Sequence, residues 1–246
     1  METAQASEPK VQVPNFCEPH STVTIFITAT SETQAQDGMV THRKSFHSKV
    51  GTGGNTEKQG ILRPEPLKYI FHRNLISHYS PFFAAAFKSS FKEGLSQEMT
   101  LEVDAKAFGV FSNWLYTQKI LDSKGYQPDM CTLAHLWILA DCFLVPVLQN
   151  KVADSLYYML NGGRERVSDF LAFCKIADQH AEGDNPLTLL AASLLTGSPR
   201  GSLDRYLDQV PRSILIKSWQ TLKTEQAPGT KRGADLQNFY VKENQK

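Results

Sequence analysis

The hydrophobic pattern of the first half of the chain predicts three short strands. Residues 22–28 are rich in β-branched side chains and nearly alternate between apolar and polar positions, which is typical of a strand. Phe26 interrupts the alternation, so both faces of this strand are expected to be partly covered. Residues 67–72 and 99–103 have the same character and predict a second and a third strand.

Apolar positions three or four residues apart predict helices between and after these strands. Ser80 before Pro81 marks one helix start, because serine caps the first turn and proline at its first position loses no hydrogen bond. Asp104 and Asp129 are predicted to cap two more helices, and Pro146 ends one helix and opens the next. The predicted helical ranges are 74–79, 81–87, 104–115, 129–144, 147–160, 167–177, 186–195, 203–207 and 214–222.

Strands mixed with helices thus give way to helices alone, which predicts the α+β class. We expect one mixed domain over residues 21–160, stopped by Gly162-Gly163, and a helical extension over residues 164–223. Residues 1–20, which are polar and contain three prolines, are expected to form a flexible arm, and residues 224–246 a polar tail.

A long insertion of low hydrophobicity, at about residues 29–66, separates the first two strands. Its one strand-like piece is about residues 44–50, and a segment of this kind is either functional or disordered. The run Gly51-Thr52-Gly53-Gly54 invites comparison with a phosphate-binding loop, but no Gly-Lys-Ser/Thr follows it. The run therefore favours a plain flexible loop.

Composition narrows the class of partner. The 26 basic and 25 acidic side chains nearly cancel, so the charge gives no general attraction to nucleic acid or to a membrane surface. The sequence has no apolar run of the roughly 20 residues that span a bilayer, and its start lacks the features of a secretory signal. Four widely spaced cysteines suggest no disulfide framework, so we expect the cytoplasm, the nucleus or both.

The sequence contains few candidate catalytic or metal-binding residues. Cys17 and His20 have the spacing of half a zinc site, with His42 and His47 downstream, but no second close pair completes it. No sequence run of a known catalytic kind is present. The sequence therefore predicts no catalytic residue, no metal, no cofactor and no small-molecule substrate, although an unrecognised enzyme stays open as an alternative.

One stretch carries a resemblance to a known family. In residues 69–83 a strand ends in His72-Arg73, a short Leu-containing helix follows, and then comes Ser80-Pro81-Phe82-Phe83. Together with Phe91-Lys92-Glu93-Gly94 and Trp114-Leu115-Tyr116-Thr117, in this order, the stretch resembles the BTB/POZ domain over residues 21–160. The sequence of these motifs is similar to that of fungal BTB proteins that carry no other named domain.

The resemblance implies a protein–protein adaptor without catalysis. Many members of the family form homodimers through their first helices, and some dock onto a cullin scaffold of a ubiquitin ligase. Phe91 and Glu93 match the apolar-x-Glu motif of the cullin-docking members, where an apolar anchor is oriented by a nearby charge. The alternative is that Phe91 packs locally and that Glu93 is a solvated surface charge.

Two departures bear on the function. In repressor-type members an aspartate begins the first strand and faces a basic residue; here Thr22 takes the place of that aspartate, and Arg73 supplies the basic residue. His72 and Arg73 are therefore candidate dimer positions or structural positions. The second departure is the link between the first two strands, at about residues 29–66, which is far longer than usual in the family and is either a partner-binding segment or disordered. No kelch repeat, MATH region or zinc finger accompanies the domain. Two hypotheses follow: a cullin adaptor, or a self-associating structural or regulatory protein without a ubiquitin-ligase link.

Overall fold

The computed structural model describes residue 14 and residues 21–28, 65–88, 90, 92–161, 166–180, 185–197, 203–225 and 236–243. The predicted arm, apart from Pro14, and nearly all of the insertion, including residues 44–50, lie outside this part. The elements are β1 (Thr22–Thr28), β2 (Leu67–His72), α2 (Arg73–Tyr79), α3 (Pro81–Lys88), α4 (Lys92–Ser96), β3 (Glu98–Glu102), α5 (Ala105–Thr117), α6 (Met130–Cys142), α7 (Pro146–Asn161), α8 (Val167–Gln179), α9 (Pro186–Gly197), η1 (Asp204–Gln209), α10 (Arg212–Glu225) and η2 (Leu236–Phe239).

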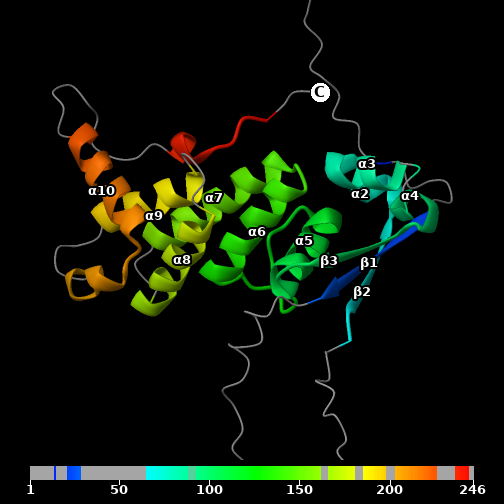
Figure 1. Ribbon diagram of the computed structural model, residues 1–246, viewed down its shortest axis with the longest axis horizontal. Helices are drawn as coiled ribbons and strands as arrows, with labels where there is room; N and C mark the ends of the chain where they lie inside the picture. Colours follow the sequence, from blue (N-terminus) through cyan, green and yellow to red (C-terminus); the bar gives the residue numbers. More distant parts are fainter. Residues whose placement is uncertain are drawn as a thin grey trace, which may run out of the picture.

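The three strands form one mixed sheet in the order β2-β1-β3 (Figure 1). β1 pairs antiparallel with β2 and parallel with β3. Val23, Ile25 and Ile27 of β1 are buried, so one face of the sheet belongs to the core. Phe26 lies on the opposite face, where the Lys68 ammonium stands 5.9 Å from the ring centroid. The predicted partial cover of both faces is therefore confirmed, and the fold is α+β as expected.

A cluster of phenylalanines fills the space between the sheet and the helices. The ring of Phe143, in the turn between α6 and α7, lies 4.7 Å from Phe83, 5.1 Å from Phe111 and 6.3 Å from Phe108. All four side chains are at most 2% exposed. Each buried ring contributes about 1.5–3 kcal/mol of hydrophobic stabilisation, and aromatic pairs at this spacing add to it.

Ser80 joins the two halves of this cluster through its buried hydroxyl. The Ser80 Oγ accepts a hydrogen bond from the Phe83 backbone N–H at 3.2 Å, as the predicted cap of α3 requires. The same hydroxyl donates to the Phe143 carbonyl at 2.7 Å. The start of α3 is thereby fixed to the turn after α6, which is 63 residues further along the chain.

The end of α6 corrects one prediction. The helix ends at Cys142 and does not run through Leu144, because the chain turns there in a Schellman motif. The Val145 N–H donates to the Ala140 carbonyl at 2.7 Å, and the Leu144 N–H to the Asp141 carbonyl at 2.9 Å. Leu144 takes the left-handed position, with φ of 57°, and is exposed. Glycine is the usual residue at such a position, so the leucine there gives no sequence signal that α6 ends.

The helical extension shares a core with the mixed domain. α8 packs against α6, α9 packs against both α7 and α8, and α10 lies along α9 (Figure 1). Phe173 and Cys174 of α8 and Leu190 of α9 are buried in the same apolar cluster as the phenylalanines of the sheet side. The predicted strands and most predicted helices are confirmed, with boundaries shifted by a few residues; residues 203–207 fall in a 3₁₀ turn, η1.

Of the predicted polar tail, residues 224–246, the structure describes residues 224–225 and 236–243. Residues 236–243 pack back onto α7 and α9, and Phe239 is only 2% exposed. Phe239, Tyr240 and Val241 stand consecutively in an otherwise polar segment, so no helical or strand period marks them. Part of the segment is therefore fixed to the fold by a few specific contacts.

We expect Ser80→Ala to lower the free energy of unfolding by about 2–4 kcal/mol, because it removes a helix cap and leaves the buried Phe143 carbonyl without a donor. Chemical denaturation of the full chain measures this loss. The exposed Ser123→Ala is the matched control and is expected to stay within about 0.5 kcal/mol of the unaltered protein. Equal effects of the two substitutions would contradict the role of Ser80.

Candidate functional site

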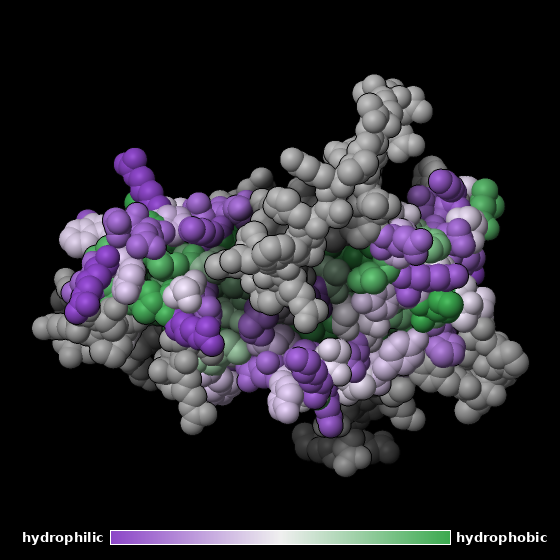
Figure 2. All heavy atoms as spheres, turned by 90° about the horizontal axis from the view of Figure 1, so that it is seen from below, coloured by the Kyte–Doolittle hydropathy of each residue, from purple (hydrophilic) through white to green (hydrophobic). Residues whose placement is uncertain are grey.

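The short helix α4 contains Glu93 of the predicted cullin motif and lies at the surface of the mixed domain. None of its five residues is buried, and Leu95 is 79% exposed. Figure 2, which views the molecule from below, shows apolar surface in green at the right-hand end, the end at which Figure 1 places the sheet. Glu93 lies half-buried two residues before Leu95, so an acidic and an apolar side chain belong to the same turn of helix.

Gln97 anchors α4 to the fold. Its side-chain nitrogen donates to the Phe87 carbonyl at 3.2 Å and to the Gly94 carbonyl at 2.5 Å, so it links the end of α3 to α4. Its backbone N–H donates to the Glu93 carbonyl, and its own carbonyl accepts from Thr24 of β1, both at 2.9 Å. Gln97 adopts a left-handed conformation, with φ of 55°. The α4 turn is thus held between a helix and the central strand.

Arg73 bonds to the same carbonyl. Its guanidinium donates to the Phe87 carbonyl at 2.8 Å, which places a positive charge at the C-terminal end of α3, where it is electrostatically favourable. Its backbone N–H donates to the Ser21 carbonyl just before β1. Arg73 therefore has a structural role within the chain.

His72 is exposed and has partners in the same chain. Its Nδ1 lies 3.3 Å from the Tyr116 hydroxyl, and the two rings meet edge to face at 6.1 Å. In the sheet register His72 stands opposite Thr22, so the position where repressor-type members carry an aspartate does lie beside His72 and Arg73. Participation of His72 and Arg73 in a dimer stays a prediction.

Of the two residues in the predicted cullin motif, the structure describes Glu93, whereas Phe91 lies outside the described residues. Leu95 and Gln97 belong to the same surface and were missed from the sequence. The segment Lys92–Ser96 is too short for a helical period and contains Gly94, so α4 itself was not predicted. A single leucine in a polar turn was the available signal for Leu95.

A polar cleft of about 450 Å³ lies between α6 and α8, and its lining includes Cys131, His135 and Asp129. Asp129 caps α6. Its carboxylate accepts hydrogen bonds from the Thr132 N–H at 2.9 Å and from the Thr132 hydroxyl at 2.8 Å. Burial, and then the nearby carboxylate of Asp129, raise the pKa of the Cys131 thiol to about 11. The Cys131 thiol therefore stays protonated near neutral pH and is a poor nucleophile.

A second hollow, of about 630 Å³, runs beside α5 and shares Lys106, Asp129 and Thr132 with the first. The Tyr69 hydroxyl lies there, 3.6 Å from where a Cβ atom on Gly109 would stand, which is an ordinary van der Waals distance. Burial raises the pKa of Tyr69, so its hydroxyl remains a neutral hydrogen-bonding group. Near neutral pH the Cys131 thiol in the first hollow and the Tyr69 hydroxyl in the second are therefore both uncharged.

Within the described ranges, no group of three or more His, Cys, Asp or Glu side chains is placed to hold a metal ion. The half-site of Cys17 and His20, together with His42, His47 and the glycine run 51–54, lies outside those ranges. Among the described helices, none combines the length and the apolar character needed to cross a membrane.

Comparison with known proteins identifies residues 64–160 of the mixed domain. The family model of the BTB/POZ domain matches residues 64–160. Kelch-like protein 40 of Xenopus tropicalis is 30% identical to the chain over 98 residues, which are 39% of this chain and 16% of that protein. The chain thus spans about a sixth of the length of this relative. Sequence, fold and comparison agree, and the chain carries a BTB/POZ domain, a protein-interaction module, at residues 64–160.

Proposed function

We propose that the protein is a non-enzymatic adaptor that binds a cullin scaffold through α4 and the preceding Phe91. The observation that carries the proposal is the exposure of Leu95 at 79% on a turn that Gln97 ties to α3 and β1. An exposed apolar side chain on a rigid support loses little conformational freedom when a partner covers it. Glu93 beside it supplies a charge that orients the partner.

The family resemblance gives this surface its partner. Phe91 and Glu93 match the apolar-x-Glu motif of the cullin-docking members, and Leu95, four residues after Phe91 in the sequence, supplies a second apolar side chain. A partner that covers a central apolar group and pairs with a charge at its rim would gain most of its binding energy from a few residues. A cytoplasmic or nuclear location goes with this proposal.

The absence of catalysis is part of the same proposal. Cys131 and His135 stand one helical turn apart on α6 and line the same cleft, so they are the pair to be weighed as a nucleophile and its base. The Cys131 thiol has a raised pKa, whereas nucleophilic cysteines have lowered ones. The cleft is better suited to polar recognition than to covalent chemistry.

We expect Phe91→Ala combined with Glu93→Ala to weaken binding to a cullin N-terminal domain at least tenfold, because the pair supplies the anchor and its orienting charge. Leu95→Ala alone is expected to weaken binding severalfold. Isothermal titration calorimetry with the purified full chain measures both effects.

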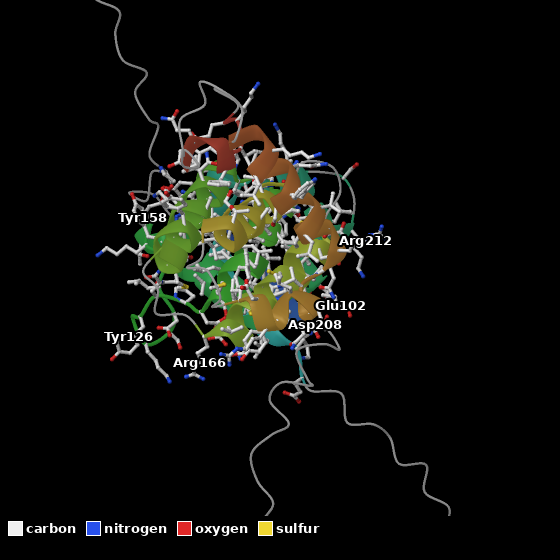
Figure 3. The ribbon with its side chains drawn as sticks, turned by 90° about the vertical axis from the view of Figure 1, so that its left-hand side faces the viewer. Glu102, Tyr126, Tyr158, Arg166, Asp208 and Arg212 are labelled. Atoms are coloured by element: carbon white, nitrogen blue, oxygen red, sulfur yellow. The ribbon has the colours of Figure 1, made fainter. Side chains whose placement is uncertain are left out.

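The matched control for that experiment is the double substitution Tyr126→Ala, Glu102→Ala. Tyr126 is 69% exposed in the loop between α5 and α6, and Glu102 is exposed at the end of β3 away from α4; both are labelled in Figure 3. The control also removes an exposed aromatic ring and an acid, and is expected to bind like the unaltered chain. If the unaltered chain and the motif variant both fail to bind, the cullin proposal is wrong.

A homodimer is proposed alongside the adaptor, because many members of the family self-associate through their first helices. Light scattering of the full chain over about 1–100 µM is expected to give twice the mass of one chain. Arg73→Ala is expected to cost about 1–2 kcal/mol of stability without changing that mass, because the guanidinium bonds to Phe87 of its own chain. A monomer at every concentration would remove the dimer.

Alkylation tests the state of Cys131. With a pKa of about 11, about one Cys131 thiol in a thousand is ionised at pH 8, so iodoacetamide should react with it at least tenfold more slowly in the folded chain than in urea. The rate should rise with each unit of pH up to about 11. Peptide mapping by mass spectrometry follows each cysteine. Rapid alkylation of Cys131 at pH 7 would mean an activated thiol and would support an enzyme.

A further inference from the structure

One face of α7 carries three side chains that contact residues 239–241 of the same chain. Asn150, Asp154 and Tyr157 are spaced four and three residues apart, so they lie along the same side of the helix. Residues 239–241 of the same chain lie against this face. They run in the opposite direction to α7, since Val241 meets Asn150, Tyr240 meets Asp154 and Phe239 meets Tyr157.

The Asn150 side chain hydrogen-bonds to both main-chain groups of Val241. Its side-chain oxygen accepts from the Val241 N–H at 2.8 Å, and its side-chain nitrogen donates to the Val241 carbonyl at 3.1 Å. The same nitrogen donates to the Glu243 carboxylate at 3.0 Å. Both hydrogens and the oxygen of the Asn150 amide are thus used on this segment. Such a pair of bonds selects extended backbone with a free N–H and leaves the side chain at that position unspecified.

Asp154 and Tyr157 contact the side chains of Tyr240 and Phe239, the two residues before Val241. The Tyr240 hydroxyl donates to the Asp154 carboxylate at 2.5 Å, and the Phe239 ring lies 6.2 Å from the Tyr157 ring in a buried position. Figure 3 labels Tyr158, the neighbour of Tyr157 on α7, which lies at the surface. Residues 240–243 have no helix or strand of their own, and the Val241 N–H and carbonyl both bond to Asn150.

We propose that this face of α7 is a binding site for an extended segment of a separate partner protein, and that residues 236–243 occupy it within the chain until the partner displaces them. The partner segment has an aromatic residue, then a tyrosine, then a residue with a free backbone N–H, and an acidic residue two positions further. The chain's own Phe239-Tyr240-Val241-Lys242-Glu243 is the template for this pattern. In Figure 1 the site is well separated from α4 and does not depend on the cullin proposal.

A tethered segment competes strongly with a free one, because its effective concentration is on the order of millimolar. The full chain should therefore bind a fluorescein-labelled peptide of residues 234–246 weakly. The double substitution Phe239→Ala, Tyr240→Phe in the full chain removes the buried ring and the hydroxyl of the internal segment. We expect it to bind the peptide at least tenfold more tightly in fluorescence anisotropy. Adding Asn150→Ala to this variant should abolish the gain.

Matched controls separate recognition from a general loosening of the fold. Lys242→Ala changes an exposed residue of the segment and should leave peptide binding as weak as in the unaltered chain. A peptide N-methylated at Val241 loses the N–H that Asn150 reads and should not bind the released variant, whereas N-methylation at Lys242 should be tolerated. Circular dichroism of each variant establishes that it remains folded.

Three results would overturn the proposal. The first is equal peptide affinity of the unaltered and the released chains, which would make the contacts purely structural. The second is binding that persists after Asn150→Ala or after N-methylation at Val241. The third is a dimer of the unaltered chain that Phe239→Ala, Tyr240→Phe converts to a monomer, because the occupant would then be a second copy of the chain and not a separate partner.

Discussion

The fold depends on the buried hydroxyl of Ser80, which bonds at once to the start of α3 and to the turn between α6 and α7. An unsatisfied carbonyl or N–H in this apolar surrounding would cost more than the bond contributes, so the two segments are held in one arrangement. Phe143 carries the bonded carbonyl and places its ring among the phenylalanines of α3 and α5. One hydroxyl and one ring thereby set how the sheet side meets the helices.

This constraint reaches the surface through α3. Because the start of α3 is fixed by Ser80, its far end presents the Phe87 carbonyl at a defined place, where Arg73 and Gln97 both donate to it. Gln97 then holds α4 and leaves Leu95 in solvent. A rigid interior thus supports an exposed apolar turn, which is a suitable arrangement for binding a protein without large rearrangement. Residues 236–243 are held in a different way from α4, because a few specific side-chain contacts fix them to α7.

The sequence predicts the strands and caps of this protein well because each is a local property. Alternation over residues 22–28 and 67–72 and the capping residues Ser80, Asp104 and Asp129 act within a few positions of the chain. The end of α6 and the packed tail were not predictable in this way. Leu144 stands where glycine is usual, and the docking of Phe239 depends on residues of α7 that are 82 or more positions away.

The candidate site, like the fold, has a part that the sequence predicts and a part that only the structure shows. The motif of Phe91 and Glu93 and the pair His72-Arg73 were available from the family resemblance, whereas their contacts were not. The bonds of Arg73 and Gln97 to Phe87 span 14 and 10 residues, and such contacts have no period in the sequence. The structure gives Arg73 a structural role and adds Leu95 to the surface, and neither result follows from the pattern of residue types.

Hydrogen exchange measured by mass spectrometry, with and without a cullin N-terminal domain, tests most directly whether α4 is the interaction surface. The account predicts slower exchange over α4 and the start of β3 when the cullin domain is bound, with no change over residues 236–243 on α7. Exchange that is unchanged over α4, or slowed only at other elements while the complex forms, would contradict it.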